Sequence, residues 1–348
     1  MAKQKLCNGN YAAIDIGSNA VRLLIKHIGF TEEGMYGTKE QLIRVPLRLG
    51  FDAFTKDKIS RRKAKKLTDL IHAYAQIMKL YEVLNYKACA TSAIRDAANG
   101  KKLIASIKKK TGVRIHILSG KEEAELIYNT HADFLQNVDG NFMYVDVGGG
   151  STEINTVING VLISSNSYNI GTIRVLSDTV DPEEWRRLEN DLSELNHLYS
   201  PIDILGSGGN INKLYRLVDK RDKILQRMSV SSLSDIYNRM TQMSLEERVK
   251  EYRLKYDRAE VIVPASHVFL TIARLINAHY IYVPTIGLVD GIIDEMLQKK
   301  RNKLALKAGV GMTDEMNQTE EDYESEIVNK RINKKIEEMI EDHTKKQE

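Results

Sequence analysis

The order of apolar and polar residues predicts a chain that alternates between short strands and helices. Apolar runs at residues 11–16 and 21–28 predict two strands of a hairpin, because Gly17, Ser18 and Asn19 lie between them. Residues 60–84 carry apolar side chains at the spacing of one helix face. Strands are expected at 87–90 and 114–118, with a Lys-rich helix between them and a further helix that begins near Lys121. The first part of the chain is therefore expected to be an α/β unit.

A second series of strands and helices begins at residue 142. Strands are predicted at 142–147, 151–158 and 161–167, and Asn159-Gly160 between the last two is typical of a tight hairpin turn. Asp181 and Pro182 are typical of a helix start. The remaining predictions are strands at 202–205 and 281–283, a Gly-rich loop at 206–210, and helices at 211–218, 232–242, 264–279 and 288–300.

The two series share a weak internal repeat, because Asp15 and Asp146 stand at matching positions before a Gly-containing turn. We therefore expect a duplicated α/β unit with a linker near residues 129–141. The expected division is an N-terminal domain over 1–130, a second domain over 131–300, and a charged tail, helical or partly disordered, over 301–348.

Composition narrows the class of protein further. The 348 residues are 42% hydrophobic and 28% charged, which is typical of a globular protein. Two cysteines are too few for a disulfide scaffold, and no apolar run reaches the ~18 residues of a membrane helix. The polar start lacks the apolar core of a signal peptide, so a cytoplasmic location and no membrane partner are expected.

The formal net charge of +4 conceals two halves of opposite sign. Residues 1–128 carry 24 Lys and Arg against 12 Asp and Glu, whereas residues 129–348 carry 27 against 35. A basic half indicates an anionic ligand, although Lys-rich solvated helix faces explain the same excess. No basic and aromatic pattern of the RNA-recognition type is present, so a specific nucleic-acid partner is not expected.

Two turns that follow predicted strands are candidates for phosphate binding. Residues 15–19 read DIGSN, which allows backbone N–H groups to approach an oxyanion but is also typical of an ordinary turn. Residues 146–153 read DVGGGSTE. Three consecutive glycines between two carboxylates exceed what a structural turn needs, so the second turn favours phosphate binding.

Three further segments carry candidate chemistry. Residues 90–95, ATSAIR, offer Ser92 and Arg95 to a phosphate, although a helix-starting Ser and a surface Arg are equally consistent with them. In residues 119–124, SGKEEA, Glu122 is expected to cap a helix, which leaves Glu123 to point into a cleft as a base for water. Residues 206–210, GSGGN, suit a phosphate, a nucleotide or neither.

Taken in order, these segments resemble the exopolyphosphatase / guanosine pentaphosphate phosphohydrolase (Ppx/GppA phosphatase) family, in its short form without the C-terminal HD-type domain. Residues 170–174, 258–264 and 287–291 also look like segments of that family, so the resemblance runs from about residue 11 to 297. It implies the actin, Hsp70 and sugar-kinase superfamily fold, an α/β fold with two ribonuclease-H-like domains around a cleft. Asp96 departs from the family pattern, which more often has Glu there.

The resemblance also implies an activity and roles for individual residues. The implied reaction is release of terminal phosphate from inorganic polyphosphate or from guanosine pentaphosphate, an alarmone of the stringent response. Glu123 would be the base, and Asp15, Asp146 and Glu153 would hold Mg²⁺ or another divalent cation. The implied phosphate-binding residues are Ser18, Asn19, Arg22, Ser92, Arg95, Gly148, Gly149, Ser151, Gly208 and Gly209.

Other functions remain open at the level of sequence. A kinase or ATPase of the same fold would need an adenosine pocket, for which residues 206–210 are the candidate. A non-catalytic sensor of alarmone or polyphosphate would bind without turnover and would not need all four acids. A plain nucleic-acid binder is suggested by the basic half alone. A homodimer is a further expectation for the partners of this chain.

Overall fold

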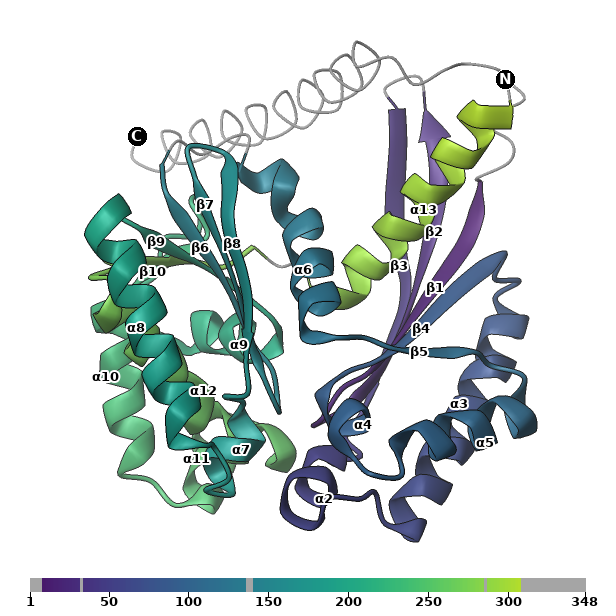
Figure 1. The fold of residues 1–348 in the computed structure, drawn as a ribbon, viewed down its shortest axis with the longest axis horizontal. Coiled ribbons are helices and arrows are strands. Elements are labelled where there is room, and N and C mark those ends of the chain that lie inside the picture. Colours follow the sequence, from purple (N-terminus) through teal and green to yellow (C-terminus); the bar gives the residue numbers. More distant parts are fainter. Residues whose placement is uncertain (1–7, 32–33, 136–139, 285–286, 308–348) are drawn as a thin grey trace, which may run out of the picture.

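The computed structural model describes residues 8–31, 34–135, 140–284 and 287–307. Two β-sheets stand side by side, and each is flanked by helices (Figure 1). The predicted α/β class with two sheet-containing halves is confirmed.

The first sheet has the strand order β3-β2-β1-β4-β5. Its antiparallel part consists of β1 (Gly9–Ile16), β2 (Val21–Thr31) and β3 (Gly34–Val45), and the parallel part adds β4 (Asn85–Ala90) and β5 (Ile115–Ile117). The predicted hairpin of β1 and β2 is confirmed. We did not predict β3, because its sequence mixes charged and apolar residues without regular alternation, as an exposed edge strand permits.

The second sheet repeats this order and adds one strand. Its order is β10-β11-β9-β6-β7-β8, so β8, β7, β6, β9 and β11 correspond to β3, β2, β1, β4 and β5. The strands are β6 (Phe142–Val147), β7 (Thr152–Ile158), β8 (Val161–Tyr168), β9 (Asp203–Ser207), β10 (Arg227–Ser229) and β11 (Tyr280–Tyr282). The three antiparallel and two parallel strands of each unit therefore confirm the duplication that the sequence indicated.

Helices of the first half pack on one face of the first sheet. They are α2 (Leu49–Lys56), α3 (Arg61–Leu80), α4 (Ser92–Asp96) and α5 (Gly100–Thr111). Among them α2 and α4 also contact the second half. Helix α3 begins where expected, because the Ser60 side chain accepts a hydrogen bond from the Lys63 N–H. Its apolar face, with Leu67, Ile71 and Tyr74, packs in one buried cluster with Ile14 of β1.

The second half has its own buried core between its sheet and α8 to α12. These helices are α8 (Pro182–Tyr199), α9 (Gly209–Leu217), α10 (Val230–Thr241), α11 (Leu245–Glu251) and α12 (Tyr256–Leu275), and the short α7 (Thr172–Leu176) precedes them. Asp181 caps α8 as predicted. Helix α11 was not predicted, and α12 starts at Tyr256 rather than at 264, with Pro264 inside it.

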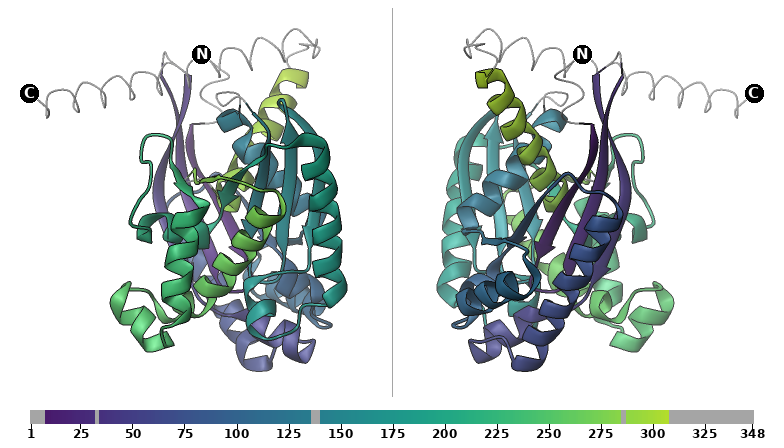
Figure 2. Two further views of the ribbon diagram at one scale, coloured as in Figure 1. Left: turned by 90° about the vertical axis from the view of Figure 1, so that its left-hand side faces the viewer. Right: turned by 90° about the vertical axis from the view of Figure 1, so that its right-hand side faces the viewer.

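Helices α6 (Gly120–Leu135) and α13 (Leu288–Lys307) lie between the two sheets (Figures 1 and 2). Helix α6 packs against β7, β8 and α13. Helix α13 packs against β1, and its Ile292, Ile293 and Leu297 share a buried cluster with Tyr11 and Leu24 of the first sheet. The end of the chain that the structure describes therefore returns to the first half.

The expected domain boundaries at residues 130 and 300 stay a prediction, although α13, which they place in the second domain, packs on the first sheet. Helix α6 continues to Leu135, into the predicted linker at 129–141, and α13 continues to Lys307, into the predicted tail. Residues 308–348 of that tail lie outside the described residues. Among the described residues no helix is long and apolar enough to span a membrane.

Candidate active site

The two turns that follow β1 and β6 meet between the two halves. Each turn closes with a backbone hydrogen bond, from Gly17 N–H to the Ala20 carbonyl (3.2 Å) and from Gly148 N–H to the Ser151 carbonyl (2.9 Å). A Cβ atom on Gly149 would lie only 2.8 Å from the Ser18 Cβ. Glycine at 149 therefore permits the close approach of the turns, which are the two segments selected from the sequence as phosphate-binding candidates.

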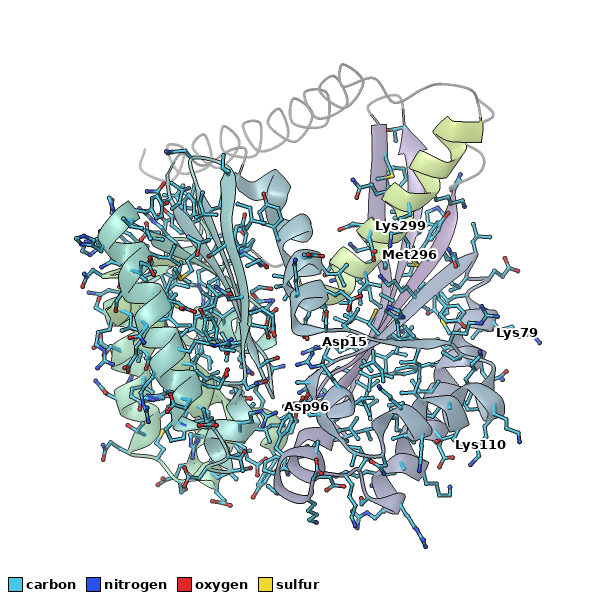
Figure 3. The ribbon with its side chains drawn as sticks, in the orientation of Figure 1. Asp15, Lys79, Asp96, Lys110, Met296 and Lys299 are labelled. Carbon is cyan, nitrogen blue, oxygen red and sulfur yellow. The ribbon has the colours of Figure 1, made fainter. Side chains whose placement is uncertain are left out.

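Asp15 lies opposite Arg22 in the register of β1 and β2. The Arg22 Nη1 donates to Asp15 Oδ2 at 2.5 Å. Asp15 is buried, and its Oδ1 atom has no hydrogen-bond partner among the described residues. Burial raises the pKa of the Asp15 carboxyl despite the opposing effect of the Arg22 charge. The site therefore contains a buried carboxylate oxygen that is available to a ligand, on the residue labelled in Figure 3.

Asp146 lies opposite Glu153 in the register of β6 and β7, the position that corresponds to Asp15 and Arg22. Ser207 Oγ donates to Asp146 Oδ2 at 3.0 Å, and Ser167 Oγ donates to Glu153 Oε1 at 2.9 Å. Burial raises the pKa of both carboxyl groups, and the charge of Asp146 raises the pKa of Glu153 further. This half of the site therefore concentrates negative charge in a buried place.

Glu122 and Glu123 have different surroundings in the first turn of α6. The Ser119 N–H donates to Glu122 Oε2 at 2.7 Å and the Glu122 N–H donates to Ser119 Oγ at 3.2 Å, so Glu122 caps the helix as expected. Glu123 is buried, and Arg95 Nη1 lies 3.5 Å from its Oε2. Burial raises the pKa of Glu123 well above its ordinary value, and the charge of Glu153 raises it further. Glu123 therefore belongs to the cluster of buried acids.

Ser92 and Arg95 of α4 reach the same region from the first half. Ser92 is buried, with its Oγ 2.9 Å from the Ser18 Oγ, and Arg95 Nη1 donates to the Leu118 carbonyl at 3.1 Å. Asp96, at the end of α4, pairs with Arg174 Nη2 of α7 at 2.6 Å across the two halves (Figure 3). The alternative of a helix-starting Ser with a surface Arg holds only in that α4 begins at Ser92, because no side chain among the described residues caps this helix and Arg95 is partly buried.

The predicted loop at 206–210 is wrong in its extent, because β9 runs through Ser207 and α9 begins at Gly209. Gly208 alone connects them, with a positive φ of 94°. A Cβ atom at this position would lie 2.7 Å from Asp146 Oδ1, so the backbone passes directly beside that carboxylate. The structure therefore places both Gly208 and Gly209 at the acid cluster, at a strand-to-helix junction.

Two arginines that we did not predict also face this region. Arg258 Nη1 of α12 donates to the Gly209 carbonyl, and Arg44 Nη2 of β3 pairs with Asp257 Oδ2 at 2.5 Å. Burial, together with the nearby charges of Arg44 and Arg22, lowers the pKa of Arg258 to about 10. The sequence contains little to indicate these two arginines, because Arg44 lies in the strand that was not predicted and residues 258–264 resemble a family segment to which no role was assigned. Asn19 reaches the same helix, with its Nδ2 3.5 Å from the Asp257 carbonyl.

The site thus combines buried acids with guanidinium groups and backbone N–H groups. The charges of Asp15, Asp146 and Glu153 all act on Glu123, which shows that the four acids share one region. Among the described residues no three His, Cys, Asp or Glu side chains are arranged to hold a metal ion by themselves. Such a site suits a polyanion, because its hydrogen-bond donors and a cation would offset the negative charge of that ligand. A buried carboxylate in the same place could accept a proton.

Comparison with known proteins agrees with this description. Exopolyphosphatase 1 of Mycobacterium tuberculosis is 24% identical over 311 residues, which cover 84% of this chain and 90% of that protein. Exopolyphosphatase 2 of the same species is 28% identical over 291 residues, covering 76% of this chain and 89% of that protein. The fold resembles a crystal structure of an exopolyphosphatase from Cytophaga hutchinsonii, with a TM-score of 0.72, 21% identity and coverage of 83% and 98%.

A second crystal structure, of the Ppx/GppA family member from Aquifex aeolicus, has a TM-score of 0.65 at 23% identity and covers 84% of this chain and 98% of that one. The profile of the Ppx/GppA phosphatase family matches residues 41–300, which is most of the chain and includes α4, α6 and the second sheet. The chain therefore belongs to the Ppx/GppA phosphatase family and is a phosphoanhydride hydrolase.

Proposed function

We propose that this chain releases the terminal phosphate of inorganic polyphosphate, of guanosine pentaphosphate, or of both, by attack of water, with Glu123 as the base. The observation that carries the proposal is the place of Glu123, which is buried at the junction of the two halves, beside Arg95 and the acids of the second sheet. A carboxylate whose pKa is raised is a stronger proton acceptor than an exposed one once it is ionised.

Phosphate groups would bind where the two turns meet. The backbone N–H groups of Gly149 and of the start of α9 would face phosphate oxygens, as the glycine content and the short Gly208 link permit. The Gly148 N–H already donates to the Ser151 carbonyl, so Gly148 would contribute by letting a phosphate approach the backbone closely. Ser18, Asn19, Ser92 and Ser151 would add side-chain donors. Positive charge would come from Arg22, Arg95 and Arg258. Phosphoryl transfer depends mainly on positioning and on stabilisation of negative charge, and little on covalent chemistry by the protein.

The acids suit a divalent cation that is shared with the substrate. Asp15 Oδ1 is buried without a hydrogen-bond partner among the described residues, and the paired Asp146 and Glu153 concentrate charge that a cation would offset. Mg²⁺ commonly binds one or two carboxylates together with phosphate oxygens and water. The cation therefore does not require three acidic side chains that are already arranged around one point, and none are so arranged among the described residues. Asp15, Asp146 and Glu153 would hold it, and it would neutralise charge on the phosphate oxygens.

The test compares phosphate release from long polyphosphate, short polyphosphate, guanosine pentaphosphate and ATP with purified protein and Mg²⁺. We expect one of the first three substrates to dominate. ATP as the preferred substrate would favour a kinase or ATPase instead, and tight binding without turnover would favour a sensor. Glu123→Gln should lower kcat by about 10²- to 10⁴-fold while polyphosphate binding persists, whereas turnover at the level of the unaltered protein would remove Glu123 as the base.

A further inference from the structure

The first turn of α6 is attached to the second sheet by a buried hydrogen bond. Asn155 of β7 donates from its Nδ2 atom to the Ala124 carbonyl at 2.9 Å, and both residues are fully buried. Ala124 is the residue directly after Glu123, and Asn155 stands two residues after Glu153 on the same strand. Because alternate residues of a strand share a face, Asn155 and Glu153 lie on the same side of β7.

A second contact holds the start of α6 against the same sheet. A Cβ atom on Gly120 would lie 2.6 Å from the Ser167 side chain, so the first residue of α6 packs directly on β8. Ser167 in turn donates to Glu153 Oε1. The beginning of α6 therefore contacts the two strands that carry and orient Glu153.

The Glu123 side chain also contacts the first half of the molecule, through Arg95. Its direct contact is Arg95 Nη1 at 3.5 Å, at the outer limit of a hydrogen bond. The backbone beside Glu123 is bonded to β7 at 2.9 Å. The backbone beside Glu123 is thus bonded to the strand that carries Glu153, although residue 123 precedes the second sheet in the sequence, while Leu126, further along α6, packs with α13 and the first sheet.

Packing stability alone does not account for an asparagine at position 155. Every residue of β7 is buried, and Asn155 Oδ1 has no hydrogen-bond partner among the described residues. A buried polar atom without a partner is unfavourable, and an apolar side chain of similar size avoids that cost. The amide group of Asn155 therefore supplies an interaction, the hydrogen bond to the Ala124 carbonyl, that a leucine or valine could not make.

We propose that Asn155 is a positioning residue for the reaction, which sets the distance between the Glu123 carboxylate and the acids of the second sheet by fixing the first turn of α6 on β7. The inference rests on the proposed role of Glu123 as the base.

The test is a double-mutant cycle between Asn155→Leu and Glu123→Gln, measured as phosphate release from polyphosphate. Asn155→Leu alone should lower kcat by about 10- to 100-fold, because small displacements of a reacting group are costly. The KM for polyphosphate should change by no more than about threefold, since ground-state binding is unaltered. In the Glu123→Gln background the same substitution should change kcat by no more than about twofold, because the base that it positions is gone.

Asn141→Leu is the matched control. Asn141 Nδ2 donates to the Tyr199 carbonyl at 2.8 Å and its Oδ1 also lacks a partner among the described residues, but it stands before β6, at the end away from Asp146. Its removal should cost stability in urea unfolding and leave kcat within about twofold. Asn155→Val, which suits a strand, serves as a second variant if Asn155→Leu does not fold.

Three outcomes would overturn the inference. The first is full kcat in a folded Asn155 variant. The second is a loss of kcat from Asn155→Leu that is the same with Glu123 present and in the Glu123→Gln background. The third is a loss of kcat from Asn141→Leu as large as that from Asn155→Leu. These outcomes are distinct from failure of the proposed function. Full turnover in the Glu123→Gln variant would show that the assignment of Glu123 as the base is wrong. Loss of turnover in Glu123→Gln together with full turnover in the Asn155 variants would show that the positioning role of Asn155 is wrong.

Discussion

Arg22 and Glu153 occupy the same position in the two copies of the strand-turn-strand unit, each directly opposite an aspartate. The copy in the first sheet pairs opposite charges, with Arg22 Nη1 2.5 Å from Asp15. The copy in the second sheet places two buried acids together. The repeat therefore has unequal electrostatics, and the uncompensated negative charge lies beside Glu123, where a cation and a phosphate chain would meet.

This arrangement predicts that the metal-free protein loses stability as pH rises from 5 to 8. The pKa values of Asp15, Glu123, Asp146 and Glu153 are raised mainly by burial, so above pH 4 the folded chain holds more protons than the unfolded chain. Stability from these groups is complete below the unfolded pKa and is lost as pH passes through the folded pKa. A shift of one pKa unit corresponds to about 1.4 kcal/mol of unfolding free energy. Urea unfolding in the presence of EDTA, repeated at several pH values, measures the loss of stability.

Glu153→Gln separates this effect from other titrations. The variant should be more stable than the unaltered chain at pH 8 and should show a shallower decline with pH, because one buried charge beside Asp146 is removed. His267 works in the opposite direction, since burial lowers its pKa, and it is present in both proteins. Equal slopes for the two proteins would contradict the prediction.

Gly208→Ala should damage the site more than an ordinary glycine substitution. Gly208 has a φ of 94°, and a Cβ atom would lie 2.7 Å from Asp146 Oδ1. We expect a loss of about 1–3 kcal/mol in unfolding free energy and a loss of phosphate release. Gly112→Ala is the control, because Gly112 also has a positive φ (75°) but its Cβ atom would meet nothing within 4 Å. Activity retained in Gly208→Ala would show that the contact with Asp146 is unimportant.

Arg174→Ala should weaken the contact between the two halves. Arg174 Nη2 pairs with Asp96 at 2.6 Å, its Nε donates to the Gly150 carbonyl at 2.8 Å, and its guanidinium lies over the Phe54 ring. We expect a loss of about 2–3 kcal/mol in unfolding free energy, because the partners stay partly buried. The exposed pair of Arg186 and Glu183 is the control, and Arg186→Ala should cost less than about 1 kcal/mol. Equal effects in urea unfolding would contradict this prediction.

Cys89 should be inert toward thiol reagents while the protein is folded. It is fully buried on β4, and burial raises its pKa to about 12, so the reactive thiolate is scarce at pH 8. In a Cys7→Ser background, a chromogenic disulfide reagent should report no thiol at pH 8 in buffer and one thiol in urea. Rapid reaction of the folded protein would show that β4 opens readily.

Local sequence signals predicted much of the secondary structure. Asn159 and Gly160 have φ values of 50° and 79°, as the hairpin turn requires, and Ser60 and Asp181 cap the helices that they were expected to start. The signals failed where an element lacks a regular pattern, as in β3, or where a helix extends past its recognised segment, as in α12. Glu122 was correctly separated from Glu123, because capping depends on a few neighbouring residues.

By itself the sequence determined the duplicated α/β order, the Gly- and acid-containing turns and the resemblance to the Ppx/GppA phosphatases, because those features reside in short stretches of chain. Only the tertiary structure decided that Glu153 faces Asp146, that Arg258 reaches Gly209, and that α13 returns to the first sheet. It also decided that Asn155 anchors the turn that carries Glu123. The physical reason is that strand register and helix packing depend on burial between segments far apart in the chain, which no local pattern encodes.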